Sequence, residues 1–156
     1  MITITALTAG VVACKKKDSD NSKDPEGTIT LSVRNWNNGR TGVCPQECRG
    51  CFYISSDDNF FDIWQYDWYE WQFASVGSVS GLGAVKQIPA SGWAASVAVI
   101  PGHGYVGKCA SKEYSNGQLE VVSTTYVRFY VKSYVISATS GGVMGADIKY
   151  QSPFVP

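Results

Sequence analysis

Three closely spaced cysteines are the first residues of this 156-residue chain whose type and spacing suggest chemistry. Cys44, Cys48 and Cys51 are separated by three and then two residues, a spacing also found among cysteines that hold an iron–sulfur cluster. With Cys109 they could instead form disulfides or a four-cysteine zinc site. We favour disulfides, with one bond from the cluster to Cys109, because Cys48 and Cys51 are too near to close a useful loop. We therefore expect no cofactor and no metal.

His103 is the chain's one histidine, and it lies between two glycines in a Pro-Gly-His-Gly segment. A catalytic triad needs a histidine that faces a nucleophile and is oriented by a carboxylate. The sequence contains neither a Gly-x-Ser-x-Gly elbow nor a His-Glu-x-x-His motif. Glycine on both sides is ordinary turn chemistry. We predict that His103 is a turn residue and that the protein is not an enzyme.

An acidic, aromatic segment is the best candidate for binding, since no Lys or Arg occurs between Cys51 and Val85. Indole rings stack on the apolar faces of sugars, and neighbouring carboxylates accept hydrogen bonds from sugar hydroxyls. The composition therefore suits glycan capture, although tryptophan is highly buried on average and these rings could equally form the core. The candidate ligand-binding residues are Asp62, Trp64, Tyr66, Asp67, Trp68, Tyr69 and Trp71, with Glu70 as a further carboxylate.

The elements that would position these residues are strands. Short apolar runs rich in Val, Ile, Tyr and Phe alternate with Gly, Pro and Asn turns, and no long amphipathic helix is evident. We predict an all-β fold, a single antiparallel β-sandwich or barrel-like domain over residues 28–156. The expected strands cover residues 28–33, 52–55, 109–114, 118–122, 124–138 and 143–150, with the central strands in residues 76–108 and a hairpin turn at Ser115-Asn116-Gly117.

Two segments carry more detailed expectations. Residues 60–73 combine helical spacing of tryptophans with strand-like alternation, and we favour a strand with a bulge or turn near residues 67–70. Residues 124–138 alternate clearly, so one face should pack inward and the other should meet solvent or a partner. The inward set is Val127, Phe129, Val131 and Val135, and the outward set is Tyr126, Arg128, Tyr130, Lys132 and Tyr134.

The amino terminus is small and apolar up to Cys14 and is followed at once by Lys15-Lys16-Lys17-Asp18. It resembles the end of a bacterial lipoprotein signal peptide, in which the cysteine is acylated, and the Lys-then-Asp run resembles the tether of Bacteroidetes-type surface lipoproteins. The resemblance implies a signal-peptide remnant over residues 1–13, a lipidated flexible tether over residues 14–27, and an outer-membrane, surface-exposed location. The basic n-region is missing, so we expect the true start codon to lie upstream; a buried strand is the alternative.

Charge and family resemblance complete the prediction. Thirteen basic residues balance thirteen acidic ones, so no overall field favours nucleic acid. Several turn phrases recur in order along the chain: Val76-Gly77, Val79-Ser80-Gly81-Leu82-Gly83, Ile88-Pro89, Gly92-Trp93, Val97-Ala98-Val99, Pro101-Gly102-His103-Gly104-Tyr105-Val106 and, in the region from Gly142 to Tyr150, Lys149-Tyr150. These phrases resemble an uncharacterised family of gut-Bacteroidetes lipoproteins that is classed as a domain of unknown function, and the chain resembles more distantly the β-sandwiches of cytolysins and lectins.

Three functions remain open at this level. The first is a lipid-anchored binding or adhesion module for a glycan or another extracellular ligand. The alternatives are a cytolysin-like protein that acts on membranes, and a structural component of the envelope whose aromatic residues are all in the core. The exposure of the aromatic side chains separates these possibilities, because only exposed rings can meet a ligand or a membrane.

Overall fold

The fold is all-β, as predicted, and consists of two antiparallel sheets. The computed structural model describes residues 23–48, 50–61 and 68–156. A five-stranded sheet has the order β1-β8-β7-β6-β4, and a three-stranded sheet has the order β2-β3-β5. The strands are β1 (Ile29–Arg34), β2 (Tyr53–Ile54), β3 (Asn59–Phe61), β4 (Tyr69–Ser78), β5 (Ser96–Ala98), β6 (His103–Ser115), β7 (Gln118–Ile136) and β8 (Val143–Gln151), with 3-10 turns η1 (Trp36–Asn38) and η2 (Leu82–Ala84).

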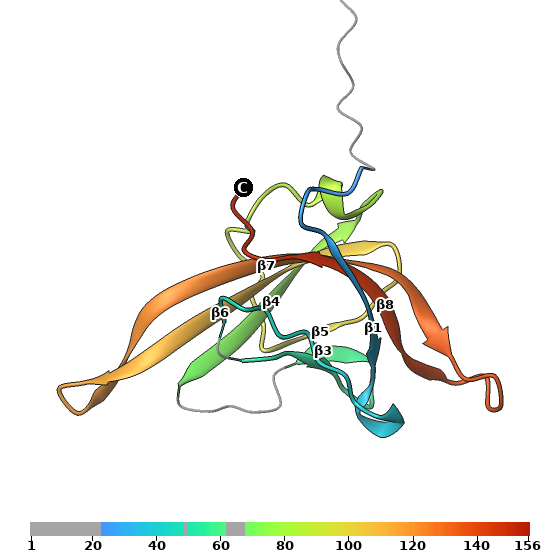
Figure 1. The fold of residues 1–156 in the computed structure, drawn as a ribbon, viewed down its shortest axis with the longest axis horizontal. Helices are drawn as coiled ribbons and strands as arrows, with labels where there is room; N and C mark the ends of the chain where they lie inside the picture. The colour runs from blue at the N-terminus through green and yellow to red at the C-terminus, as the bar shows by residue number, and fades with distance from the viewer. Residues whose placement is uncertain (1–22, 49, 62–67) are drawn as a thin grey trace, which may run out of the picture.

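The larger sheet is an arch that covers the smaller one (Figure 1). Its hairpins β6–β7 and β7–β8 extend downward on either side as two arms, and the small sheet lies beneath the centre of the arch. The described part of the chain begins on the upper, outer side of the arch, where it also ends. The arch therefore has an inner face that holds the core and an outer face on the side of the chain ends.

The β6–β7 turn forms as the sequence predicts. β6 ends at Ser115 and β7 begins at Gln118, so Asn116 and Gly117 make a two-residue loop. Their φ angles are 52° and 81°. A tight hairpin needs positive φ at both central residues, and Asn-Gly is the pair that adopts this conformation most readily. This turn fixes the register of the longest strand pair in the protein.

Aromatic side chains from both sheets meet between them and form the core. Phe52 and Phe60 lie under the arch, and their rings are 5.2 Å and 4.9 Å from the ring of Phe129 on β7. Phe52 also packs edge-on against Trp71 at 5.0 Å. Edge-to-face packing of this kind is favourable beyond the area it buries. Val127, Phe129 and Val131 are fully buried, which confirms the predicted inward face of β7 up to Val131, whereas Val135, also predicted to face inward, is only half-buried.

The alternation of β7 changes phase at a bulge, which the sequence analysis did not anticipate. The register with β8 shifts between Val131 and Ser133. One extra residue in a strand reverses which side chains point inward beyond it. Tyr134, predicted to face outward, instead packs against the core and donates a hydrogen bond of 2.7 Å from its hydroxyl to the Val99 carbonyl.

Residues 76–108 are not the central strands that the sequence analysis predicted. Only their two ends extend β4 and β6, while the middle holds η2, irregular chain and the short edge strand β5. Some apolar residues of this stretch cover the outer face of the arch instead, whereas Val97, Val99 and Tyr105 join the core between the sheets. Val85 is 1% exposed and clusters with Val106 and Phe154. Apolar runs separated by glycine and proline occur both in strands and in irregular chain that packs over a sheet. Periodicity alone therefore does not distinguish central strands from such a cap.

The strand prediction for residues 60–73 agrees with both described ends of that segment. β3 ends at Phe61, β4 begins at Tyr69, and Trp68 forms a turn before it. Residues 62–67 lie outside the described residues. The acidic aromatic segment therefore joins the small sheet to an edge strand of the arch.

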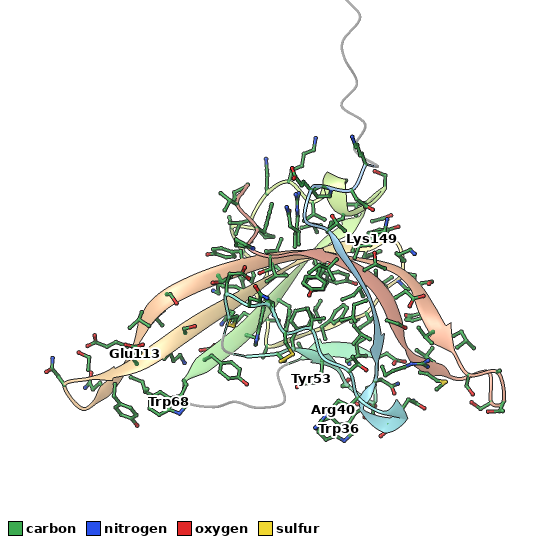
Figure 2. All side chains as sticks on the ribbon, viewed as in Figure 1. Trp36, Arg40, Tyr53, Trp68, Glu113 and Lys149 are labelled. Atoms are coloured by element: carbon green, nitrogen blue, oxygen red, sulfur yellow. A yellow bond between two sulfur atoms is a disulfide. The ribbon has the colours of Figure 1, made fainter. Side chains whose placement is uncertain are left out.

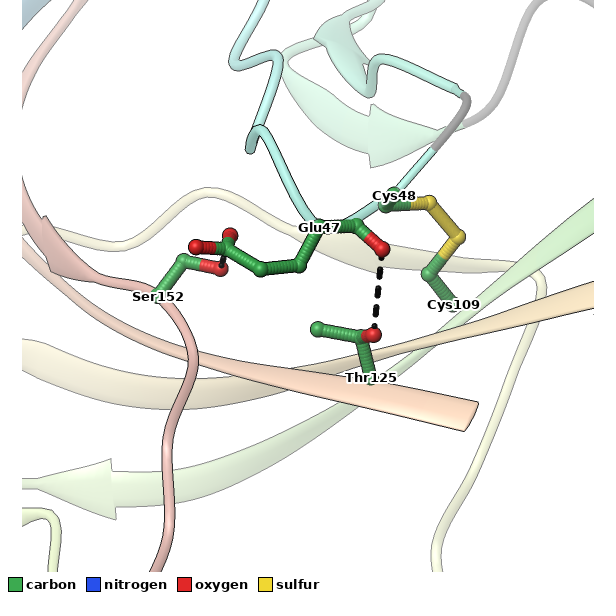
Figure 3. Close-up of a disulfide and its surroundings, with 5 residues drawn as sticks. All are labelled: Glu47, Cys48, Cys109, Thr125 and Ser152. Atoms are coloured by element: carbon green, nitrogen blue, oxygen red, sulfur yellow. Dashed lines mark hydrogen bonds between the residues drawn. A yellow bond between two sulfur atoms is a disulfide. The ribbon is translucent and has the colours of Figure 1, made fainter. Parts of the chain in front are cut away.

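Two disulfides fasten the loop of residues 44–51 to the arch. Cys44 bonds to Cys51, and Cys48 bonds to Cys109 on β6, in agreement with the predicted link to Cys109. Figure 3 shows the adjoining hydrogen bonds: the Thr125 hydroxyl donates to the Glu47 carbonyl at 3.3 Å, and the Ser152 hydroxyl donates to the Glu47 carboxylate at 2.8 Å. The loop is thus held by β6, by β7 and by the chain just after β8.

We predict that Phe52→Ala lowers the free energy of unfolding by about 3–5 kcal/mol, because it empties the space between the two sheets. Chemical denaturation followed by tryptophan fluorescence measures this change. Val155→Ala, at a position that is 81% exposed, is the control and should change stability by less than about 0.5 kcal/mol. A cost below about 1 kcal/mol for Phe52→Ala would contradict the proposed core.

We also predict unequal contributions from the two disulfides. Cys48–Cys109 joins residues 61 apart and Cys44–Cys51 joins residues 7 apart. Loop-closure entropy then gives about 4 kcal/mol for the first bond and about 2 kcal/mol for the second. Denaturation of the paired alanine variants, Cys48→Ala with Cys109→Ala and Cys44→Ala with Cys51→Ala, tests the order. A larger loss in the second variant would refute it.

Candidate functional site

The predicted glycan-binding aromatics that the structure describes do not all reach the surface. Trp71 is 2% exposed and Tyr69 is 7% exposed, so both belong to the core and offer no ring face to a ligand. Trp71 stacks on Phe73 at 5.9 Å, while the ring of Tyr69 lies against the backbone of Gly50, where even an added Cβ would clash. The physical reason is that β4 turns its odd-numbered residues toward the small sheet.

Trp68 is the member of that predicted set whose ring is described and exposed. It is 47% exposed and packs edge-on against Tyr114 of the β6–β7 arm, with ring centres 5.6 Å apart. Asp62, Trp64, Tyr66 and Asp67 lie outside the described residues, as does the predicted lipidation residue Cys14. Among the described aromatic residues of the predicted ligand-binding set, Trp68 is therefore the one whose ring can meet a ligand.

A second exposed tryptophan, which the sequence analysis did not select, lies in the turn after β1. Trp36 opens η1 and is 42% exposed. Its turn is fixed by Asn35, whose backbone N–H donates to the Met144 carbonyl at 2.8 Å and whose side-chain amide donates to the Val143 carbonyl at 3.2 Å. The Asn38 amide donates to the Asn35 side-chain oxygen at 2.6 Å. These bonds hold an exposed indole on a rigid turn.

Trp36 forms a stack with a cation and a second ring, and we call Trp36, Arg40 and Tyr53 the Trp36 platform. The Arg40 guanidinium carbon lies 4.3 Å from the centre of the Trp36 ring and 5.7 Å from that of Tyr53. Tyr53 in turn lies so close to Gly42 that a Cβ there would meet its ring at 2.5 Å. Figure 2 shows the three residues at the base of the molecule, opposite the chain ends.

A large aromatic residue within a turn was the signal that could have found this platform. Trp36 is followed by Asn37, Asn38 and Gly39, and Gly39 closes η1 with a φ of 83°. A turn of this composition lies at the surface, so a tryptophan inside it has little core to enter. The predicted site was instead a group of aromatic residues within one acidic segment, and two of its three described aromatic residues, Tyr69 and Trp71, are buried in the core.

Glu70, the further carboxylate of the acidic aromatic segment, does reach the surface on the outer face of β4. The Lys112 ammonium forms an ion pair with it at 2.9 Å. The hydrogen bond from Lys112 is the main cause that lowers the pKa of Glu70, and the charge of Lys108 adds to it. Glu70 is thus ionised at neutral pH and belongs to a charged surface on the outer face of β4 and β6.

The remaining candidates are the single histidine and possible metal ligands. His103 ends a turn in which its backbone N–H donates to the Ile100 carbonyl at 3.2 Å, as predicted. Among residues 23–48, 50–61 and 68–156, no group of three His, Cys, Asp or Glu residues is arranged to hold a metal ion. No helix in this part of the chain is long and apolar enough to cross a bilayer.

The comparisons with known proteins identify a family and no function. Residues 30–155 match the family described as Domain of unknown function (DUF5036). No curated protein and no solved structure matches the chain. The match spans β1 through β8 and includes both disulfides and the Trp36 platform. The chain therefore belongs to the family of the Domain of unknown function (DUF5036).

Proposed function

We propose that this protein is a non-catalytic module that binds a glycan at the Trp36 platform, tethered to the outer membrane of a bacterial envelope by a lipid on Cys14. The observation that carries the proposal is an indole that is 42% exposed and yet held by a hydrogen-bonded turn. The 42% of Trp36 that remains exposed adds nothing to the stability of the fold through burial, because that surface stays in water. Its arrangement is better explained by recognition.

The platform has the chemistry that sugars require. The flat indole offers an apolar face for the C–H groups of a sugar ring, while Arg40 and Tyr53 stiffen it from one side. Polar side chains belong to the same region: Asn37, next to Trp36 in the chain, is exposed, and the half-buried Asp58 accepts a hydrogen bond of 3.4 Å from the Asn35 amide. A rigid site loses little conformational entropy on binding, which favours affinity for a small polar ligand.

The position of the platform fits the proposed anchor. Both described ends of the chain lie on the outer side of the arch, and the platform lies at the opposite end of the molecule (Figure 2). A tether that continues from the amino-terminal end would therefore leave Trp36, Tyr53 and Trp68 directed away from the membrane. That direction suits a ligand in the medium or on another cell.

Membrane insertion of the β6–β7 arm is less consistent with its residues. The tip is the polar sequence Ser115-Asn116-Gly117-Gln118, with Glu113 and Glu120 directly behind it. Placing carboxylates and unpaired turn groups in a bilayer is costly. A binding module is therefore favoured over a cytolysin-like activity, and dye release from liposomes separates the two, since a binding module should leave the vesicles intact.

We predict that Trp36→Ala weakens binding of a glycan found on an array by about tenfold, because it removes the stacking face. Trp36→Phe, which keeps a smaller flat ring, should lose less. Isothermal titration calorimetry with the selected glycan measures both affinities, and thermal denaturation checks that the variants remain folded. Ile100→Ala is the control, because Ile100 is 41% exposed and lies outside the platform.

Binding measurements on the parent protein, Trp36→Ala and Ile100→Ala can reject the Trp36 platform as a glycan site. If the parent protein binds no glycan on a broad array, or if Trp36→Ala binds as tightly as the parent while remaining folded, the Trp36 platform is not a glycan site. Equal losses in Trp36→Ala and Ile100→Ala would indicate a general surface effect and would also reject it.

The proposed anchor gives a separate prediction. In the native host, the mature protein should begin at Cys14 with fatty acids attached, and it should partition into the detergent phase of a Triton X-114 extraction. Cys14→Ala should move to the aqueous phase, because the lipid supplies the membrane affinity. Mass spectrometry of the mature amino terminus decides the matter, and an intact start without lipid would rule the anchor out.

A further inference from the structure

A polar groove runs along the outer face of the arch, on the opposite side of the sheet from the core. It has a volume of about 330 Å³ and is lined chiefly by Glu70, Gln72, Lys108, Thr124 and Tyr126. We call it the outer groove. We infer that the outer groove binds an acidic oligosaccharide, a second ligand site that is independent of the Trp36 platform.

Strand register explains why these side chains share one face. Glu70 pairs with Ala110, and Ala110 pairs with Thr124; one step along, Gln72 pairs with Lys108, and Lys108 pairs with Tyr126. Directly paired residues of neighbouring strands point to the same side of a sheet. The floor of the groove is therefore two cross-strand rows on β4, β6 and β7, whose positions are fixed by backbone hydrogen bonds.

The Trp93 ring packs beside two of the residues that line the groove. The Trp93 ring lies 6.1 Å from the ring of Tyr126, and the Lys108 ammonium lies 4.9 Å from the centre of the Trp93 ring. The Trp93 indole N–H donates to the Pro89 carbonyl at 3.2 Å, which fixes the ring on its loop. The groove thus combines the Tyr126 ring, with Trp93 packed beside it, with Glu, Gln, Lys and Thr side chains. These polar side chains can donate hydrogen bonds to sugar hydroxyls and accept hydrogen bonds from them.

The charges of the groove favour an acidic ligand. Glu70 is already paired with Lys112 at 2.9 Å. Lys108 makes no ion pair with any carboxylate in the described part of the chain, and its ammonium is directed at the Trp93 ring. Beside the groove, the ammonium groups of Lys108 and Lys112 thus accompany the carboxylate of Glu70. A ligand carboxylate or sulfate near Lys108 would balance this excess positive charge.

A saccharide fits the groove better than an acidic peptide does. Peptide recognition on a sheet uses main-chain hydrogen bonds along a free strand edge and pockets for alternate side chains. The outer groove lies instead on the sheet face, where backbone groups of β6 are paired on both sides with β4 and β7. Its polar side chains and aromatic rings suit many hydroxyl groups on a ring-shaped ligand.

The experiment measures binding of oligogalacturonate, of a neutral maltooligosaccharide of equal length, and of oligoglutamate to the full chain by isothermal titration calorimetry. We expect the parent to bind oligogalacturonate most tightly. Lys108→Gln should weaken that binding by about fivefold, because it removes the free cation. Glu70→Gln should strengthen it by about twofold to fivefold, because it removes the carboxylate and releases Lys112.

Two matched variants separate the groove from the net charge of the protein. Lys132→Gln and Glu120→Gln make the same charge changes at exposed positions outside the groove and should leave the affinity unchanged. The inference is overturned if the parent does not bind oligogalacturonate, if the neutral sugar or oligoglutamate binds equally well, or if the matched variants reproduce the effects of Lys108→Gln and Glu70→Gln. Trp36→Ala should not affect this binding, so failure here leaves the Trp36 platform untouched, and failure of that platform leaves this site untouched.

Discussion

The packing of two phenylalanines beneath an arched sheet is the interaction on which the rest of this structure depends. Phe60 lies in the three-residue strand β3, and Phe52 directly precedes the two-residue strand β2; strands this short are not stable alone. They are stabilised because the two phenylalanine rings are completely buried against Trp71, Phe73 and Phe129 of the large sheet. The Cys48–Cys109 bond holds the loop before β2 in the same place. Without this contact, the small sheet would have no core and the arch would expose its inner face.

That core determines which aromatic residues remain for binding. β4 covers the small sheet, so Tyr69 and Trp71 are buried even though their aromatic side chains would suit sugar binding. The exposed rings lie where strands end: Trp36 follows β1, and Trp68 precedes β4. Side chains in loops and at strand ends contribute little to the core, so they can contact ligands. The Trp36 platform thus lies on a part of the surface that the core does not need, and the outer groove lies on the sheet face opposite the core.

The outer groove exists because the cap on the outer face ends before the β6–β7 arm. Arg128 holds this cap in place, since its guanidinium donates to the Val85 carbonyl at 2.8 Å and to the Gln151 side chain at 2.7 Å and lies over the Phe154 ring at 4.8 Å. Burial by these neighbours lowers the pKa of Arg128. Beyond Tyr126 the cap ends at Trp93, and the polar rows of β4, β6 and β7 meet solvent.

Local patterns determined the all-β class, the Asn116-Gly117 hairpin, the inward face of β7 up to Val131 and the link from the cysteine cluster to Cys109, because each depends on turn chemistry, alternation or chain length. Tertiary structure decided the rest. Whether residues 76–108 formed strands or a cap, whether Trp71 was buried and Trp36 exposed, and which way Tyr134 turned after the bulge depended on contacts between distant segments. A sequence pattern states which side chains share a face, but only packing decides what covers that face.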